Sequence, residues 1–298
     1  MSTSPTDGPT RVDSAGLTVW SPSARELARR QVRRRLRTRS ILIASLVSLL
    51  AFGALTAGVL SSPGWPTVQD YFFSPFHARE SLPSIAKGFV KNVALFLLAE
   101  PSILILALAV ALARQATSPW LVPVRILAVI YTDLLRGIPT ILLVLLLGFG
   151  MPALGLQGVP NSFFFWALVS LVLSYGAYVA EVFRSGIESI HPSQFASADA
   201  LGLSRAQTMR HVVVPQAVRR VIPPLLNDFV ALQKDTALVS VLGVFEALNA
   251  ASDYSNFNFN DTSIVVVAVF FIVLTIPLAR FTDWLQRRIA DRERAGAR

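Results

Sequence analysis

Cysteine is absent from this chain of 298 residues, and charged residues make up only 15% of it. Without cysteine there is no disulfide, no thiolate ligand for zinc and no thiol nucleophile. The three histidines are widely spaced, which argues against a metal site built from imidazoles. Soluble domains usually carry about 25% charged residues. A chain this poor in charge cannot cover a water-exposed surface in the ordinary way, and the sequence therefore indicates an integral membrane protein.

Long apolar blocks are the dominant pattern in the remaining sequence, which is 53% hydrophobic with a mean hydropathy of +0.55. Residues 41–60 hold no charge over 20 residues, the length that crosses about 30 Å of hydrocarbon as a helix. Lipid offers no partner for free backbone N–H and C=O groups, so spanning segments must be helical. We predict an all-α, polytopic membrane bundle of about six transmembrane helices. The expected spans are 41–60, 89–113, 126–149, 163–183, 225–247 and 263–280.

The arginines indicate the orientation of these spans. Residues 1–40 hold nine arginines and residues 184–220 hold five, whereas 150–162 and 248–262 hold none. By the positive-inside rule, both termini are expected in the cytoplasm. The net charge of +9 is then explained without nucleic acid, and no aromatic platform for bases accompanies the basic tail.

The N-terminal region divides into two parts. Residues 1–24 are rich in Ser, Thr, Pro, Gly and Asp, a composition typical of disorder. Residues 25–39 are strongly basic and directly precede the first span. A signal peptide is the alternative interpretation, but the length of the basic part and of the apolar block favours a retained signal anchor. The basic run is expected to determine topology beside anionic lipid.

The connection over 184–220 is too long for a tight turn. Its residues 193–204 predict a short helix that ends near Gly202, and helical character resumes from Arg205 to His211 until Pro215 breaks it. Such a helix–glycine–helix element would form a rigid projection on the cytoplasmic side. A surface hairpin with no function is the alternative.

Several motifs resemble one known family. Residues 196–215 resemble the EAA loop of the permease subunits of ABC importers, with Gly202 and Pro215 at its two most characteristic positions and Val212 and Val214 in place of Ile and Leu. Five further segments are similar to the polar amino acid subfamily, in the right order and spacing. They are Leu135–Pro139, Ala177–Ile187, Val214–Ala217, Pro223–Leu225 and Leu232–Val241.

The resemblance covers roughly residues 85–285, and it departs from the family pattern in two places. Ala196 stands where the family has Glu, and Ser197 where it has Ala. This puts one polar contact with the ATPase in doubt, although Asp199 and nearby arginines could replace it. The first span also lies outside the resemblance. We therefore expect a basic tail over 1–40, an extra helix over 41–60, a permease domain over 85–285 with its coupling loop at 184–220, and a basic tail over 286–298.

The resemblance implies a division of labour among several subunits. Importers of this kind join two permease subunits, identical or paralogous, to ABC ATPase subunits and an extracytoplasmic amino-acid-binding protein, in the inner membrane of a bacterium. This chain has no Gly-x-x-x-x-Gly-Lys-Ser/Thr loop, so it is not expected to be an enzyme or to bind a cofactor, and the partner uses the ATP. The residues expected to couple to the ATPase are Ala196, Ala198, Asp199, Gly202, Leu203 and Pro215.

Charges inside the predicted spans are candidates for the substrate pathway. A charge at the bilayer centre costs about 3 kcal/mol, so it usually faces a bundle interior or a wet cavity. An amino-acid zwitterion carries an ammonium and a carboxylate, which an acid and a lysine would complement. Alternatively, Glu100 and Lys234 neutralise each other and only fix the packing. The candidate residues are Glu100, Tyr178, Glu181, Lys234 and Asp235.

Two other classes of function remain open. A stand-alone secondary transporter would need a site for a coupling ion and often has an internal inverted repeat, which the sequence does not show. A membrane anchor or scaffold would need neither charges within the spans nor a patterned cytoplasmic loop. Both features favour the transport subunit.

Overall fold

The computed structural model describes residues 10–12, 18–20, 24–116 and 118–296. The chain divides into two compact units, Met1–Thr67 and Val68–Arg298. Much of the predicted disordered segment 1–24 lies outside the described residues. Within it, β1 (Thr10–Val12) and β2 (Thr18–Trp20) pair as an antiparallel ribbon, with Thr10 opposite Trp20. Outside this short ribbon the described chain is helical, which confirms the all-α class.

The first unit consists mainly of one long helix, α1 (Ala24–Leu60). Its N-terminal half carries the basic run, and its C-terminal half is the predicted span 41–60. No part of its most apolar window is buried within the chain. A helix that exposes leucine and isoleucine on every side is suited to lipid or to another protein rather than to water.

The second unit is a bundle built around three helices. Helix α3 (Pro75–Gln115) packs along α6 (Phe163–Glu188), and both contact α9 (Val214–Asp235). Ile103, Leu171 and Leu232, one from each helix, are at most 1% exposed. Helix α11 (Thr262–Gly296) packs on α3 and α9. The outward residues of α3 are also apolar, with Ile105 71% exposed, as expected for a surface that faces lipid.

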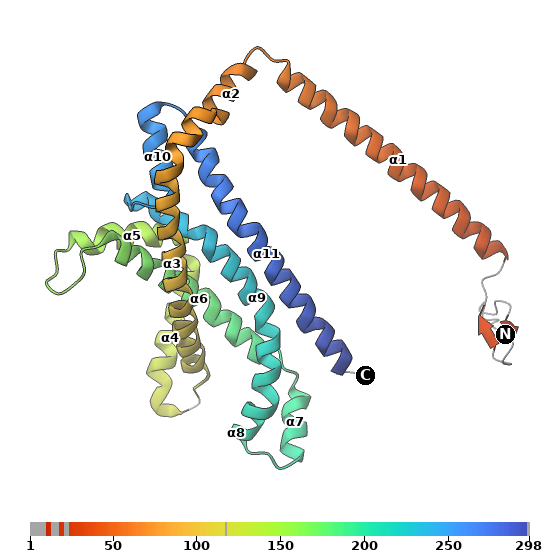
Figure 1. Cartoon of the computed structure of the whole chain (residues 1–298). Helices are drawn as coiled ribbons and strands as arrows, with labels where there is room; N and C mark the ends of the chain where they lie inside the picture. Colours follow the sequence, from red (N-terminus) through yellow and green to blue (C-terminus); the bar gives the residue numbers. More distant parts are fainter. Residues whose placement is uncertain (1–9, 13–17, 21–23, 117, 297–298) are drawn as a thin grey trace. The chain divides into compact units, whose positions relative to one another are not determined.

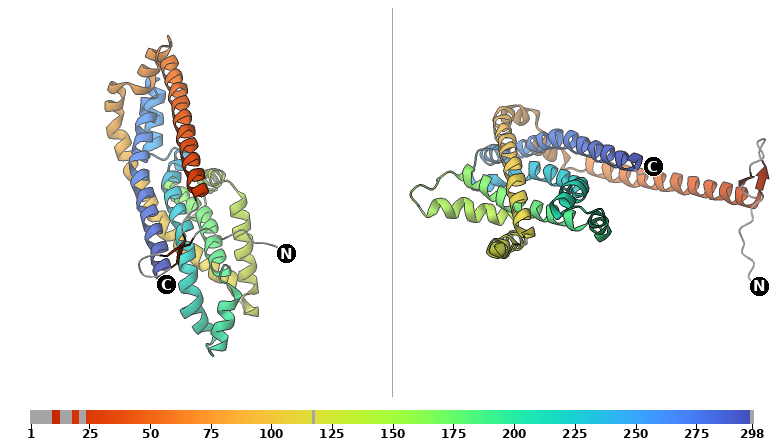
Figure 2. Two further views of the ribbon diagram at one scale, coloured as in Figure 1. Left: turned by 90° about the vertical axis from the view of Figure 1, so that its right-hand side faces the viewer. Right: turned by 90° about the horizontal axis from the view of Figure 1, so that it is seen from below.

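Short elements occupy the two ends of this unit. Figures 1 and 2 show α7 (Pro192–Ala200) and α8 (Arg205–Thr208) at one end, and α10 (Ala247–Asn258) at the opposite end. The other short elements are α2 (Trp65–Phe73), the 3-10 turn η1 (Pro119–Leu121), the π-helical turn η2 (Met209–Val213) and the 3-10 segment η3 (Thr236–Leu242).

The predicted span 126–149 is not one straight helix, because the chain bends sharply within it. Helix α4 (Val122–Gly137) and helix α5 (Thr140–Ala153) meet at an angle of 105°. Ile138 is extended, with φ −98° and ψ 125°. Pro139 lacks an N–H and disfavours the helical conformation of the residue before it, which explains a break at this point.

The predicted span 225–247 is also wrong as one helix. Helix α9 ends at Asp235, η3 follows, and Gly243 takes the left-handed conformation with φ 68°. The chain then re-enters a helix, α10, in the segment 248–262, which lies between the last two expected spans. In the described residues, four helices are long and apolar enough to cross a membrane, or five if α4 and α5 together form one bent span.

Candidate coupling segment and intramembrane polar site

Residues 192–215, named here the coupling segment, form two short helices around a glycine turn. The predicted helix ending near Gly202 is confirmed by α7, which stops at Ala200. The Gly202 N–H donates to Asp199 O at 2.9 Å, and the Leu203 N–H donates to Ala198 O at 3.1 Å. These are the two bonds of a Schellman turn, which needs a left-handed residue after the helix. Gly202 supplies it with φ 73°.

The second half of the coupling segment is fixed by its own cap. Ser204 begins α8 with a capping box, in which the Ser204 N–H donates to Gln207 Oε1 at 2.8 Å. The helix then widens into the π turn η2 and continues as α9. The predicted break at Pro215 is wrong. Pro215 lies in the first turn of α9, where a missing N–H is well tolerated.

The coupling segment has a buried and an exposed side. Phe195 of α7 and Met209 of η2 pack against the same buried cluster of Ile190, Val213 and Ala217, which fixes α7 against η2. Ala198 is 2% exposed, so the structure places this predicted coupling residue inside the segment. Leu201 is 80% exposed at the tip. The sequence interpretation passed over Leu201, although an apolar residue directly before a turn glycine is a visible signal. Of the other predicted coupling residues, Leu203 is half-buried, and the exposed ones are Ala196, Asp199, Gly202 and Pro215.

A pocket of about 380 Å³ separates the coupling segment from the end of α3. Phe195, Asp199 and Arg205 line it on one side and Gln115 on the other. The segment is therefore held to the bundle through α6 and α9, which pack against its residue Val213, and it is not packed solidly against α3. Such a mounting suits an element that transmits force, because it is rigid internally and has space to shift.

Glu181 lies in a cluster of arginines from three helices. It accepts a hydrogen bond from Arg114 at 2.9 Å and two from Arg184, one on each carboxylate oxygen, and Arg136 approaches it at 3.7 Å. Its side chain is 20% exposed. Arg114 also donates to Thr132. The structure thus places this predicted substrate residue where it ties together the ends of α3 and α4 and the side of α6, with its carboxylate occupied.

The other predicted pathway residues lie around the packing of α3, α6 and α9. Tyr175 donates to Asp235 at 2.7 Å. Asp228, which the sequence interpretation missed, interacts electrostatically with both Glu100 and Tyr175. Its position at the start of an apolar block hid it. Glu100, Asp228, Tyr175 and Asp235 therefore form one group, here named the polar site.

Lys234 stands apart from the polar site in its contacts, whereas Tyr178 lies beside the polar site, near Tyr175. Lys234 is exposed, and within the described part of the chain no ion pair joins it to Glu100. Tyr178 is 40% exposed and donates to the Arg136 carbonyl at 3.1 Å. The mutual neutralisation of Glu100 and Lys234 considered from the sequence is therefore not what this structure contains.

A buried polar node supports the irregular backbone between η3 and α10. Glu246 is 1% exposed and caps α10 by accepting from the Asn249 N–H at 2.6 Å. Asn92 of α3 donates to Glu246 at 2.8 Å and accepts from the Ala247 N–H at 3.0 Å. Non-helical backbone within a membrane bundle needs such partners. Sequence reasoning missed this node, because its members are 154 residues apart.

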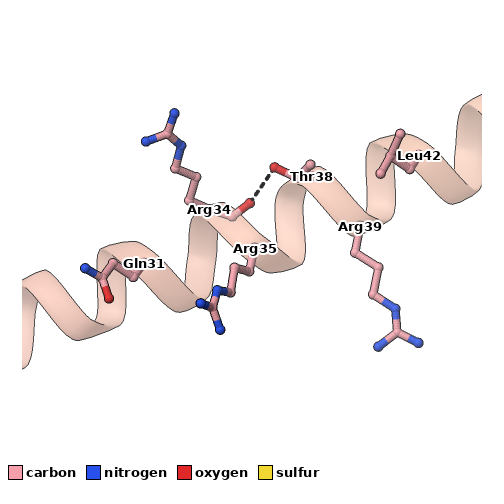
Figure 3. A pocket seen from close by; sticks show the side chains of 6 residues that line it. All are labelled: Gln31, Arg34, Arg35, Thr38, Arg39 and Leu42. Atoms are coloured by element: carbon pink, nitrogen blue, oxygen red, sulfur yellow. Dashed lines mark hydrogen bonds between the residues drawn. The ribbon is translucent and has the colours of Figure 1, made fainter.

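A hollow of about 570 Å³ lies along α1, but residues of one helix alone line it, so it does not form a binding site. Figure 3 shows Arg35 and Arg39 on one side of the helix and Arg34 on the other. Thr38 donates to the Arg34 carbonyl at 2.9 Å. In the described residues no group of three or more His, Cys, Asp or Glu side chains could hold a metal ion.

The bundle and its helical coupling segment define a multi-helix membrane permease component. Residues 105–291 match the family model described as "Binding-protein-dependent transport system inner membrane component". That match covers more than half of the chain, and the chain belongs to this family.

Named relatives agree with this assignment. The glutamine transport system permease protein GlnP of Escherichia coli K12 is 34% identical over 163 residues, 54% of this chain and 74% of that protein. The probable glutamine ABC transporter permease protein GlnM of Bacillus subtilis is 30% identical over 203 residues, 68% and 91% of the two chains. The resemblance to amino acid ABC permeases seen in the sequence is confirmed.

Solved structures show the same fold. A crystal structure of an amino acid ABC transporter with histidines aligns with a TM-score of 0.64 at 27% identity, over 70% of this chain and 95% of that chain. The MetNI methionine ABC transporter aligns with a TM-score of 0.56 at 17% identity, over 69% and 96%. The second likeness supports the fold alone.

Proposed function

We propose that this chain is the transmembrane permease subunit of an ATP-driven importer that moves polar amino acids into a bacterial cell. The observation that carries the proposal is the family match over residues 105–291, which includes the coupling segment and, of the polar site, Tyr175, Asp228 and Asp235. The relatives named for glutamine transport support an amino acid as the substrate.

In this proposal the chain translocates the substrate and leaves ATP hydrolysis to separate ABC ATPase subunits. The coupling segment is the contact for the ATPase, through Asp199, Leu201 and Leu203. A second permease subunit and an extracytoplasmic binding protein complete the importer in the inner membrane. The positive-inside rule supports a cytoplasmic position for both termini, with the basic half of α1 beside anionic lipid headgroups. The chain itself binds no cofactor.

Co-purification with the cognate ATPase tests this division of labour. We expect the tagged chain to retain an ABC ATPase in detergent, and the complex in liposomes to hydrolyse ATP faster when a loaded amino-acid-binding protein is added. The chain alone should bind no nucleotide. Saturable ATP binding to the isolated chain, or uptake driven by an ion gradient without ATP, would contradict the proposal and favour a secondary transporter.

The polar site is the proposed place where the substrate passes the middle of the bundle. Glu100 and Asp235 would contact the substrate ammonium, and Lys234 would contact its carboxylate if the helices shift during transport. Tyr178, whose hydroxyl donates to the Arg136 carbonyl, is proposed to line the same pathway. The surrounding arginines occupy the carboxylate of Glu181. Glu181 would therefore act in this pathway indirectly, by positioning those arginines.

Neutralising Glu100 distinguishes a substrate contact at this residue from a role in helix packing alone. We expect Glu100→Gln to lower uptake by about tenfold, the loss of one charge-assisted hydrogen bond, without lowering thermal stability. No positive partner is left behind, because no ion pair to Lys234 exists in the described structure. Uptake assays and thermal unfolding of the purified variant measure the two effects.

The double variant Glu100→Gln with Lys234→Met is the control. A packing ion pair would make each single variant unstable and the double variant nearly normal. Recovery of uptake in the double variant to the parental rate would reject substrate contact at Glu100. Continued loss of uptake in a stable double variant would support it.

A further inference from the structure

A second pocket, of about 340 Å³, lies between the end of α3, the start of α4 and the end of α6. Three arginines line it, namely Arg114, Arg125 and Arg184, together with one carboxylate, Glu188. This leaves two positive charges in excess. Including Glu181 and its other partner Arg136 adds one charge of each sign and does not change the excess. The pocket therefore favours an anion.

Gln115 adds an unused hydrogen-bond donor to this wall. Its side-chain amide nitrogen is buried and has no hydrogen-bond partner in the described structure. Gln115 lines this pocket and also the neighbouring one beside the coupling segment. Buried donors in folded proteins are almost always paired. Guanidinium groups and an amide N–H together offer only donors, which suits a ligand that is rich in acceptor oxygens.

The remaining wall of the pocket is apolar. It consists of Ile126, Val129 and Ile130 of α4, and Ile126 and Ile130 are 52% and 54% exposed. Trp120, directly before α4, is 92% exposed. Exposed tryptophans gather at the level of the lipid headgroups in membrane proteins. The pocket thus joins a cationic floor to an apolar helix face beside a residue typical of the membrane interface.

We propose that this pocket binds the headgroup of an anionic phospholipid. The phosphate lies among Arg114, Arg125 and Arg184, and an acyl chain runs along the exposed apolar face of α4. Basic pockets between transmembrane helices bind anionic headgroups in this way. A bound lipid would reinforce the junction of α3, α4 and α6 from which the coupling segment extends.

Arg125 is the residue to change first. It is exposed, and in the described structure it has no ion pair with a carboxylate, so Arg125→Gln leaves no orphaned acid. Arg114 is unsuitable, because its loss would disturb Glu181 and Thr132. Gln115→Leu is the second variant, since it removes a donor that the fold does not use. Arg280→Gln is the matched control, because Arg280 is 78% exposed and pairs only loosely with Asp283 at 3.6 Å.

Amide hydrogen exchange of the full-length chain in an uncharged detergent localises the binding. We expect dioleoyl-phosphatidylglycerol to slow exchange in peptides that cover residues 110–130, while dioleoyl-phosphatidylcholine does not. Arg125→Gln and Gln115→Leu should need about tenfold more phosphatidylglycerol for half of this protection. Arg280→Gln should behave as the parent does. The peptides of α1 report separately on the basic run there.

Four results with the isolated chain, and a fifth with the assembled importer, would overturn the proposal. The first four are equal protection by phosphatidylcholine, equal protection by inorganic phosphate, protection in both pocket variants that matches the parent, and protection confined to α1. Equal protection by inorganic phosphate would identify a site for free anions. The assembled importer should show the same protection of residues 110–130 as the isolated chain. Its loss on assembly would mean that a partner subunit, and not lipid, covers the pocket.

Discussion

Replacing Gly202 with valine should abolish most uptake while leaving membrane insertion intact. Gly202 has φ 73°, and a Cβ built there meets no atom within 4 Å, so the backbone conformation, and not crowding, makes glycine necessary. The left-handed conformation costs a residue with a side chain about 1–2 kcal/mol, and a β-branched residue is the worst case. The strain is relieved by opening the Schellman turn, which moves α7 relative to α8. We expect uptake to fall about tenfold or more, measured beside the amount of chain in the membrane.

Gly202→Asn is the matched control, because asparagine tolerates the left-handed conformation. It should retain most of the uptake and the association with the ATPase. If both variants lose uptake equally, the side chain itself obstructs docking, and a close approach of the ATPase to Gly202 becomes the explanation. Parental uptake in Gly202→Val would show that the coupling segment is a surface hairpin without a role in transport.

The helices that sequence reasoning predicted well are those whose apolar blocks are long and unbroken. The blocks at 89–113, 163–183 and 263–280 lie within α3, α6 and α11. Their length alone determines a spanning helix, because no other secondary structure satisfies the backbone in lipid. The coupling segment was equally accessible, since a glycine after a short helix and a Ser-x-x-Gln cap are local signals.

Hydropathy failed where local backbone chemistry overrides an apolar run. Ile138 and Pro139 interrupt the block at 126–149, and Gly243 and Glu246 interrupt the one at 225–247. A proline after an apolar residue and a glycine before an acid were visible signals. The partners that make the second break tolerable were not visible. Asn92 reaches Glu246 from a helix far away in the sequence, and only the packed structure brings them together.

The partners of Glu181, like those of Glu246, are visible only in the packed structure. As an acid in a predicted span, Glu181 suggested substrate contact. In the structure it neutralises arginines from the ends of α3 and α4 and from its own helix. The charge within a predicted span correctly identified a group whose burial in the membrane costs free energy. It could not distinguish a substrate contact from an ion cluster, because the sequence does not show which helix ends bring their arginines to Glu181.

Glu181→Gln should therefore destabilise the chain more than it alters the substrate pathway. The change leaves the guanidinium groups of Arg114 and Arg136 without a carboxylate, and their side chains are 13% and 38% exposed. Breaking a fully buried ion pair costs about 3–5 kcal/mol, and partial exposure reduces this to about 2–3 kcal/mol here. For a chain of this size we expect the unfolding midpoint to fall by roughly 5–10 °C, measured by thermal unfolding in detergent.

Glu188→Gln is the matched control, because Glu188 is 62% exposed and, among the described residues, its one ion pair is with Arg184. It should shift the midpoint by no more than about 1–2 °C, the effect of an exposed ion pair. The double variant Arg114→Gln with Glu181→Gln should lose less stability than the two single variants added together. It removes both charges of this ion pair, so neither is left buried without its partner. If Glu181→Gln is as stable as Glu188→Gln and still fails to transport, Glu181 contacts the substrate, and the arginines around it orient that contact.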